Sequence, residues 1–410
     1  MSKILSQGAL TNVAFALLLA TPIATALSRN AAFPLLLVVA LLLVVTVALQ
    51  SEGTKKLIDV ARWMFSFKLD APAAAIALAI ILFALVSLLW SPAPGRGLGA
   101  LAGASTAALV SVYCCALLAR HISIPDWLIW ALPLTIAVGC FLLVSELMFG
   151  SPVRSALGAF PHFSRLNRAA LTIALMLPLL FLIGDNRSRI ITCAAVWPMA
   201  LAVVLMSASE TAKIIIIVSI VTLVIARFIQ ARYLLFFVGM FVIATHAFAP
   251  LVLTALYSFF PRDFIEANAS SLAQHFVRLE IWWAYAQQVF AAPVIGHGLQ
   301  ASYNAIDAYA GSDEGIIRGL VFIHPHNFSI QVWYELGMLG VTLSSTMIFL
   351  LLRFILKLPD IQLKVAVMQV IGVWSVAYVS HGAWQHWWWA LIGIITILFS
   401  SLRNQSSRSI

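Results

Sequence analysis

Charged residues are scarce in this chain. Only 10% of its 410 residues are Asp, Glu, Lys or Arg, whereas 62% are hydrophobic and the mean hydropathy is +1.01. An average soluble domain is about 45–50% apolar and about 25% charged. The composition therefore excludes an ordinary soluble globule and indicates an integral membrane protein that crosses the bilayer many times.

Cysteines and nucleotide-binding loops are also scarce. The four cysteines, Cys114, Cys115, Cys140 and Cys193, all fall inside apolar segments and lack metal-ligand spacing. They predict neither a zinc site nor a disulfide framework, and small apolar packing residues are the expected role. The chain has no Gly-rich loop of the Walker or Rossmann type, which argues against direct use of cytoplasmic ATP.

Apolar runs near the roughly 20 residues that cross a bilayer recur from end to end. Because backbone polar groups in lipid must be hydrogen-bonded internally, these runs should be helices. We predict an all-α polytopic membrane protein in which residues 1–410 form one integral membrane domain with about twelve spans. The expected spans are 9–27, 31–50, 71–90, 98–118, 127–147, 168–184, 190–207, 214–230, 234–256, 328–355, 365–380 and 386–402.

The distribution of cationic residues predicts the orientation. With the N-terminus inside, fifteen of the 24 Lys and Arg fall in cytoplasmic segments, as short cationic loops should. Both termini are then cytoplasmic, and the first span, which lacks a small-residue cleavage site, is expected to be a retained helix. The net charge of +9 is explained by this topology and by anionic lipid, so no nucleic-acid partner is expected.

Two long segments are expected on the outer side. One runs from 148 to 167, and the other, 257–327, is a large periplasmic loop between the ninth and tenth spans. Loops of this length are usually functional or disordered. The second contains an amphipathic helical pattern from Phe276 to Phe290, which predicts surface helices on the outer face of the membrane.

Several motifs border these segments. They are Asn-Arg-Ala-Ala at 167–170, Ser-Ala-Ser-Glu-Thr-Ala-Lys at 207–213, Arg-Leu-Glu-Ile-Trp at 278–282, Pro-Val-Ile-Gly-His-Gly at 293–298, His-Pro-His-Asn at 324–327, Gln-Val-Trp-Tyr-Glu-Leu-Gly-Met-Leu-Gly at 331–340 and Trp-Gln-His-Trp-Trp at 384–388. Their order resembles the signature of the O-antigen ligase and polymerase superfamily, and most of all the O-antigen ligase-like proteins of Gram-negative bacteria. The resemblance covers about residues 160–390.

This resemblance implies a metal-independent, inverting glycosyltransferase of the GT-C type that needs no cofactor. Such enzymes transfer a glycan from undecaprenyl diphosphate to an acceptor on the periplasmic face of the inner membrane. The acceptor is lipid A-core oligosaccharide for the ligases and a growing glycan for the polymerases. The enzyme must deprotonate an acceptor hydroxyl and stabilise the charge on the departing diphosphate.

Two histidines before the tenth span are the candidate bases. His326 stands where the family has its catalytic His, and a neutral imidazole near pH 7 is a suitable proton acceptor. His324 is the second candidate, as a residue that orients the acceptor or tunes its neighbour. Interfacial histidines at a helix end are the structural alternative.

Arginines are the candidate diphosphate ligands, because the planar guanidinium forms bidentate, charge-assisted hydrogen bonds. Arg278 matches an essential Arg of the family, and a salt bridge to Glu280 is its structural alternative. Arg165 or Arg168 is expected to form a second cationic arm, with Arg168 the better match, although either can equally be a lipid headgroup anchor.

The turn at 207–213 departs from the family pattern. Many relatives carry Arg there, whereas this chain has Glu210, followed by Lys213. Lys213 can bring positive charge to the site, but the i, i+3 spacing favours an ion pair with Glu210. Glu335 lies within the tenth span, where a carboxylate needs partners, and is expected to orient an Arg or to tie helices together.

Two further features have structural and functional interpretations. The glycines around His297 predict a tight turn with close backbone approach. The tryptophans at 384 and 387–389 indicate an aromatic membrane belt. The functional alternative is that these rings stack on sugars. Beyond the ligases, the same sequence is compatible with an O-antigen or exopolysaccharide polymerase, a protein O-oligosaccharyltransferase, or a transporter of a lipid-linked glycan.

Overall fold

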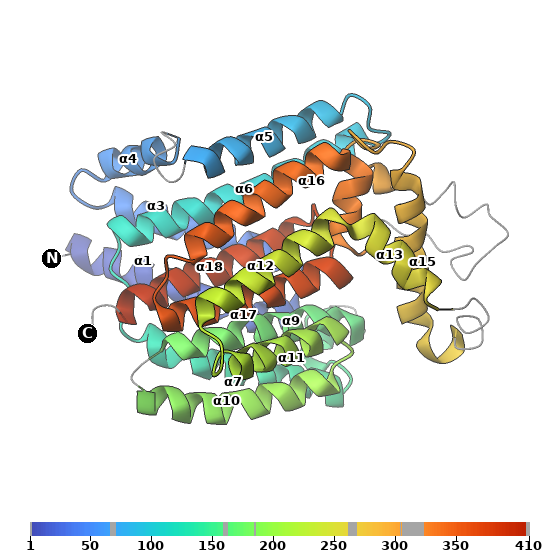
Figure 1. The fold of residues 1–410 in the computed structure, drawn as a ribbon. Coiled ribbons are helices and arrows are strands. Elements are labelled where there is room, and N and C mark those ends of the chain that lie inside the picture. Colours follow the sequence, from blue (N-terminus) through green and yellow to red (C-terminus); the bar gives the residue numbers. More distant parts are fainter. Residues whose placement is uncertain are drawn as a thin grey trace.

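The computed structural model describes residues 2–65, 71–158, 163–183, 186–260, 269–303, 305 and 324–406. Every regular element in these ranges is a helix (Figure 1). The helices are α1 (Ser2–Leu19), α2 (Thr21–Leu27), α3 (Ala32–Ala48), α4 (Gly53–Phe65), α5 (Ala71–Ser87), α6 (Pro94–Arg120), α7 (Leu128–Met148), α8 (Pro152–Ala156), η1 (Phe163–Leu166), α9 (Asn167–Met176), η2 (Leu177–Leu182), α10 (Asn186–Met206), α11 (Glu210–Ile225), α12 (Ala231–Ala247), α13 (Ala249–Ser258), α15 (Ala269–Val289), η3 (Ala301–Tyr303), α16 (Phe328–Ile355), α17 (Asp360–Val379) and α18 (His386–Ser406).

Several of these helices are long and apolar enough to cross a membrane. Within the described residues they are α6, α7, α10, α16 and α17, five in all, or up to seven if the bent pairs α1–α2 and α12–α13 each count as one span. Shorter apolar helices cover 32–48, 71–87 and 167–182. The described part of the chain is thus all-helical, which supports a helical membrane protein. The predicted number of twelve spans is not shown, because only five to seven candidates meet the length and hydropathy of a crossing.

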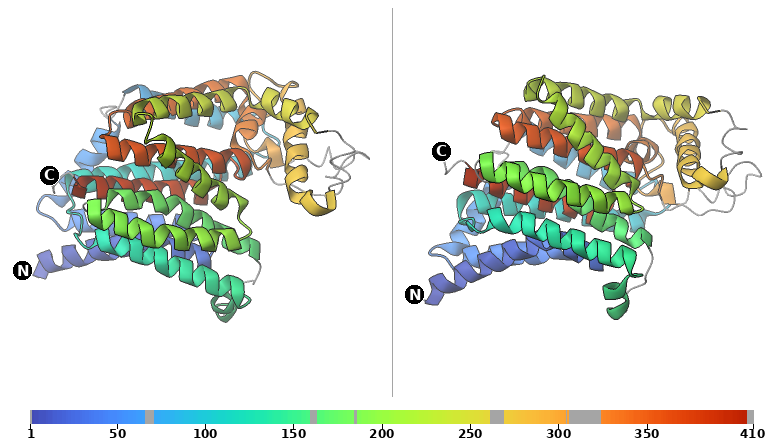
Figure 2. Two further views of the ribbon diagram at one scale, coloured as in Figure 1. Left: turned by 60° about the horizontal axis from the view of Figure 1, so that its bottom comes forward. Right: turned by 90° about the horizontal axis from the view of Figure 1, so that it is seen from below.

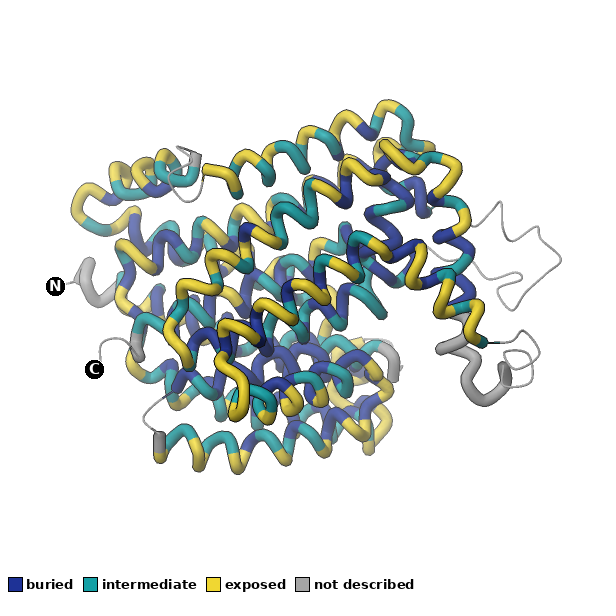
Figure 3. The backbone as a smooth tube through the Cα atoms, viewed as in Figure 1, coloured by how far each residue is buried: buried dark blue, intermediate teal, exposed yellow. Residues whose placement is uncertain are grey.

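The long helices run roughly side by side in one bundle (Figures 1 and 2). The two termini lie at the same end of the bundle, and α13 and α15 project at the opposite end in every view. The closest packing is between α6 and α18, α11 and α17, and α1 and α3. Buried residues lie on the inward turns, whereas the outward turns are largely exposed (Figure 3), as expected for helices whose outer surface faces lipid.

Two predicted spans are bent rather than straight. The ninth, 234–256, is broken where α12 and α13 meet at an angle of 80°, and Phe248, Ala249 and Pro250 lie at this break. The first is bent by 56° between α1 and α2, with Pro22 in the first turn of α2. Proline lacks the backbone N–H that continues a helix, so it is found where a new helix begins.

The tenth span contains a kink at Gly337, whose backbone (φ 60°, ψ −161°) is in a region that only glycine readily occupies. The segment 293–298 supplies the hydrogen bonds that the helix loses there. The backbone N–H groups of His297 and Gly298 donate to the carbonyls of Tyr334 and Glu335, both at 2.9 Å. In the other direction, the N–H groups at 338 and 339 donate to the carbonyls at 293 and 294, at 2.8 and 3.1 Å.

The predicted tight turn around His297 is confirmed. Gly296 and Gly298 have φ values of 68° and 94°, and a Cβ at Gly298 would lie 2.6 Å from Ser91 Cα. A Cβ at Gly296 would overlap the backbone of Glu335. Glycine is required here because two backbones meet, and the turn fixes the segment before η3 against α16.

The predicted helix in the large loop is also present as α15. Of the expected loop 257–327, the structure describes 257–260, 269–303, 305 and 324–327, and the rest lies outside the described residues. The buried face of α15 includes Leu279, Ile281, Trp282 and Tyr285, which pack on Tyr334 and Ile330 of α16. The helix therefore docks on the bundle through its apolar stripe.

Candidate functional site

A cavity of about 230 Å³ lies between Arg278 of α15, the segment before α16 and the segment after α17. Helices α9, α11, α16 and α18 all begin at this cavity. Because helix N-termini carry partial positive charge, their convergence favours an anion. The lining residues are Asn167, Arg168, Leu171, Ala208, Ser209, Glu210, Thr211, Arg278, His324, His326, Ser380, His381, Gln385 and Trp387.

The imidazole of His326 lies on the cavity wall with one nitrogen committed to the protein. Its Nδ1 is 3.2 Å from the backbone carbonyl oxygen of Ser380, which can only accept a hydrogen bond. Nδ1 therefore carries the proton in the neutral ring, and Nε2 has the lone pair. Burial lowers the pKa of His326 below its usual 6.5, the bond to Ser380 opposes this, and the charge of Arg278 lowers it further.

The backbone around His326 explains how the ring reaches this position. His326 has φ 54°, a left-handed conformation that few non-glycine residues adopt. On one side, the carbonyl of Pro325 accepts a 2.9 Å hydrogen bond from the indole of Trp282 in α15. On the other, the side chain of Asn327 caps α16 by accepting from the N–H of Ile330 at 3.0 Å. The strained residue is held from both sides.

His324 supports His326 rather than duplicating it. Its Nδ1 accepts the backbone N–H of His326 at 3.1 Å, and the ring centroids are 4.2 Å apart. Its Nε2 is 2.8 Å from the side-chain amide of Gln385. Burial and the nearby charges of His326 and Arg168 lower the pKa of His324 to about 3, so it stays neutral.

Arg278 lines the cavity from α15. One Nη1 hydrogen bond goes to the carbonyl oxygen of Val379 at 3.3 Å, and the side chain is half-buried. Burial lowers the pKa of Arg278, and the negative charge of Glu210 partly opposes this. A guanidinium has five N–H donors, so the one hydrogen bond to Val379 within the described structure leaves capacity for an anionic ligand.

Arg168 is the second arginine of the cavity. It is anchored by hydrogen bonds from Nη1 to the carbonyl of Arg29 at 2.5 Å and to Asn30 Oδ1 at 2.7 Å. Its guanidinium also lies 3.7 Å above the ring of Trp387, a cation–π contact. Arg165 is half-buried in η1 and is not among the cavity-lining residues.

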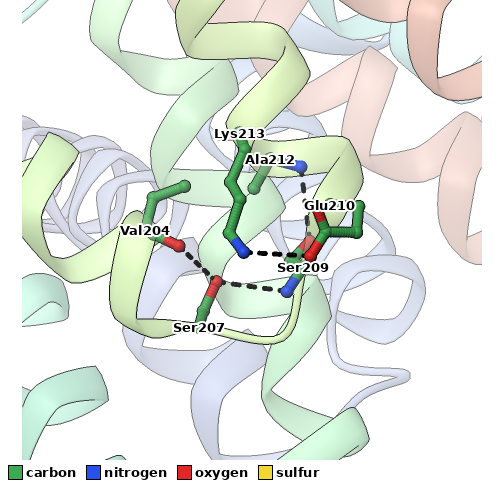
Figure 4. A network of polar contacts seen from close by, with 6 residues as sticks. All are labelled: Val204, Ser207, Ser209, Glu210, Ala212 and Lys213. Carbon is green, nitrogen blue, oxygen red and sulfur yellow. Dashed lines mark hydrogen bonds and ion pairs between the residues drawn. The ribbon is translucent and has the colours of Figure 1, made fainter. Parts of the chain in front are cut away.

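The turn between α10 and α11 places Glu210, not Lys213, on the cavity wall. Figure 4 shows the polar contacts of this turn. Lys213 Nζ pairs with Glu210 Oε1 at 2.9 Å, as the i, i+3 spacing predicted. Ser209 caps α11 by accepting from the N–H of Ala212 at 3.3 Å. The cation of Lys213 is therefore paired with Glu210, and the cavity wall at this turn carries a carboxylate.

Glu335 ties elements together and has no arginine partner among its hydrogen bonds in the described structure. Oε1 accepts from Ser302 Oγ at 2.5 Å and from Gln331 Nε2 at 2.8 Å, and Oε2 accepts from Trp384 Nε1 at 2.6 Å. Gln331 also accepts from the N–H of Ala383 at 2.8 Å. Of the two roles expected for Glu335, the structure supports the linking of helices. These hydrogen bonds position the segment 380–385 beside His326.

The tryptophans of the last predicted span do not form an outward-facing belt. Trp387 and Trp388 are only 4% and 3% exposed, and the indole of Trp384 donates to Glu335. The belt interpretation is wrong for Trp387 and Trp388 because helix packing buries these two rings, which the sequence alone placed at an interface. Trp384 is partly buried. Stacking of a sugar on Trp387 is also unsupported, since Arg168 already covers a face of the ring.

The sequence motifs missed part of the cavity. Asn167 and Gln385 stood within the motifs at 167–170 and 384–388 but were given no role, and Ser380 and His381 were given none either. The clustering of His381 and His386 within a short outer segment was the available signal. What brings 380–385 to His326 is the hydrogen bonding through Gln331 and Glu335, which sequence spacing does not reveal.

The fold and the cavity define a helical membrane protein with a polar site of histidines and arginines at one end of the bundle. Residues 194–344 match the family model described as O-Antigen ligase. Two Rickettsia proteins provisionally named polysaccharide ligases are similar: that of R. conorii is 27% identical over 140 residues, or 32% of this chain and 34% of the relative. That of R. prowazekii is 28% identical over 132 residues, or 30% of this chain and 31% of the relative.

These matches agree with the resemblance inferred from the motifs and support the O-antigen ligase-like superfamily. It spans about a third of the length of the curated relatives it matches. The matched segment includes Glu210, Arg278, His324 and His326 but not Arg168 or His381.

Proposed function

We propose that this protein is an O-antigen ligase that transfers a glycan from undecaprenyl diphosphate to lipid A-core oligosaccharide. The reaction is metal-independent and inverts the anomeric carbon, with His326 as the general base. The observation that carries the proposal is the single cavity in which His326 lies beside Arg278 and Arg168.

The state of His326 suits a general base. With Nδ1–H bound to Ser380, the lone pair on Nε2 is available for the proton of the acceptor hydroxyl. The lowered pKa of His326 keeps the ring neutral at pH 7, ready to accept a proton. As the hydroxyl oxygen bonds to the anomeric carbon, its proton passes to Nε2 and the bond to the diphosphate oxygen breaks. A positioned base of this kind contributes about 10²–10⁴-fold.

Two arginines and the converging helix ends suit a diphosphate. Arg278 and Arg168 line the cavity, and the N-termini of α9, α11, α16 and α18 add partial positive charge. The charge that develops on the leaving group is stabilised most where donors are preorganised and water is largely excluded. The cavity of about 230 Å³ has room for the reacting end of the donor.

The proposed topology places the cavity on the periplasmic face of the inner membrane. We propose twelve spans in one integral domain, in which α1–α2, α9–η2 and α12–α13 each act as one crossing. Both termini are cytoplasmic, in keeping with their shared position at the end of the bundle opposite α15. The segment 257–327 is then the periplasmic loop, with Arg278 on its helix.

The direct test measures glycan transfer by purified protein from a polyprenyl diphosphate-linked glycan to lipid A-core. The variant His326→Ala should lose transfer by about 10²–10⁴-fold while it still binds the lipid donor. His121→Ala is the matched control, because His121 follows α6 and is not among the cavity-lining residues. Intact transfer by His326→Ala would overturn the base assignment.

A polymerase uses the same donor, and the sequence left that alternative open. Deletion of the gene followed by analysis of surface glycans separates the two. Loss of capped lipopolysaccharide with accumulation of lipid-linked polymer supports a ligase, whereas absence of the polymer itself supports a polymerase. A lipid-linked glycan transporter predicts no transfer by the purified protein at all.

A further inference from the structure

His381 is a cavity residue that the proposed mechanism does not use. It follows α17 and lies with its ring against Trp387 and Trp388, at centroid distances of 4.8 and 5.1 Å. Its Nδ1 is buried and has no hydrogen-bond partner among the described residues. Buried polar atoms are nearly always paired, so an unpaired one at a cavity needs an explanation.

Asn167, which also lines this cavity, carries a second such atom. It opens α9, and its side-chain Oδ1 is buried and also lacks a hydrogen-bond partner within the described structure. Oδ1 can only accept, so it requires a donor such as a hydroxyl or an amide N–H. An incoming ligand that carries such groups would satisfy both Asn167 and His381 at once.

The ligand group that fits these atoms is neutral. Burial holds the pKa of His381 well below 6.5, and the nearby charges of Arg168, His324, His326 and Arg278 lower it further. The neutral ring is one donor and one acceptor, and the Asn167 amide is also uncharged. Such groups recognise hydroxyls, whereas the arginines suit the phosphates. Within the described residues, no three His, Cys, Asp or Glu side chains are grouped so that they could hold a metal ion.

We propose that His381 and Asn167 form a sugar subsite that binds the hydroxyl or amide groups of the sugar attached to the diphosphate of the donor. This assignment rests on the proposed transferase function and adds two substrate-binding residues to it. The first sugar must lie next to the diphosphate, and the subsite shares its cavity with Arg278 and Arg168.

The test compares the binding of two lipids to the purified full-length chain: polyprenyl diphosphate, and the same lipid carrying one sugar. In His381→Phe, which keeps a ring between the tryptophans, affinity for the glycosylated lipid should fall about tenfold, the effect of losing one hydrogen bond. Affinity for the sugar-free lipid should stay unchanged. Asn167→Ala should behave in the same way, whereas Arg278→Gln should weaken both lipids.

Two further variants identify the nitrogen and guard against misfolding. His381→Asn places an amide near the position of Nδ1 and should retain most of the sugar-dependent affinity. His381→Gln, which reaches towards the position of Nε2, should not. If His381→Phe does not fold, the Asn and Gln variants and Asn167→Ala give the same comparison.

Each other outcome overturns the assignment in a distinguishable way. Equal weakening of both lipids by folded variants would mean that these residues contact the diphosphate. Unchanged binding of both lipids with a raised KM for the acceptor would place the sugar subsite on the acceptor instead. If the unaltered protein binds neither lipid, the proposed donor itself is wrong, and the subsite falls with it.

Discussion

His326 and Ser380 are joined across two helix ends: the Nδ1–H of the histidine donates to the carbonyl oxygen of the serine at 3.2 Å. The bond links the segment before α16 to the segment after α17. It selects the tautomer with its lone pair on Nε2 and fixes the ring on the cavity wall. The ring of His326 is therefore positioned before any substrate arrives.

The left-handed backbone of His326 allows catalysis and folding to be separated by mutation. Asn tolerates φ 54°, whereas a β-branched residue does not. His326→Asn should be inactive yet nearly as stable as the parent protein. His326→Val should be inactive and also less stable, by about 1–3 kcal/mol. Thermal unfolding in detergent, beside a transfer assay, checks this, and equal stability of the two variants would contradict the strained conformation.

The positive charge of Arg278 should appear in the pH dependence of transfer. The proposed mechanism requires neutral His326, so activity should fall as pH drops through the lowered pKa of that residue, below 6.5. Arg278→Gln removes a charge that lowers this pKa, so the acid limb of kcat/KM should move to higher pH. Arg278→Lys keeps the charge and should leave the limb in place. An unmoved limb in the Gln variant would mean that another group controls it.

Gly337 should be intolerant of any side chain. An added Cβ would lie 2.5 Å from the carbonyl oxygen of Val294, and the backbone conformation itself is open only to glycine. We expect Gly337→Ala to destabilise the protein by about 3 kcal/mol or more. Gly99→Ala in α6 is the control, because a Cβ there meets no atom within 4 Å. The measurement is the melting temperature of each variant in detergent. Similar melting temperatures for Gly337→Ala and Gly99→Ala would refute the requirement for glycine at the kink.

The hydrogen bonds of Glu335 should be needed for stability. Glu335→Gln puts an N–H₂ group opposite donors from Ser302, Gln331 and Trp384, so one donor is left unpaired. The expected loss is about 1–3 kcal/mol. Glu210→Gln, at a side chain that is 46% exposed, serves as the comparison and should change stability little. Unfolding in detergent measures the loss of stability in Glu335→Gln and in Glu210→Gln.

Lys213 should matter little for transfer. It pairs with Glu210 at the surface and is not among the cavity-lining residues. An exposed ion pair contributes about 0–1 kcal/mol, so Lys213→Ala should change kcat/KM by less than about tenfold. A loss as large as that of His326→Ala would show that Lys213 replaces the family Arg after all.

Much of the fold followed from patterns within the chain. Apolar runs located the helices, and the glycines around His297 predicted the tight turn that meets α16. Local chemistry also predicted the pairing of Glu210 with Lys213, because residues three apart on a helix face the same side. The bend before α13 was missed, since composition reports apolar length and not direction.

The candidate site was only partly predictable. Motif resemblance pointed to His326, His324, Arg278 and Arg168, and the structure brings these four to one cavity. It leaves Arg165 and Lys213 off the lining, a distinction that required the actual packing of η1 and α11. Glu335 was expected to find partners, but their identity depended on which elements fold against α16.

The sequence alone determined that this is a helical membrane protein, because hydrophobic length and low charge act locally and additively along the chain. It also determined which side chains can act as a base and which can bind an anion. Only the tertiary structure decided that Ser380 orients His326, and that the neutral atoms of His381 and Asn167 share its cavity. Those relationships join segments far apart in the chain, and they exist only once helix packing and hydrogen bonds such as those of Glu335 hold the segments together.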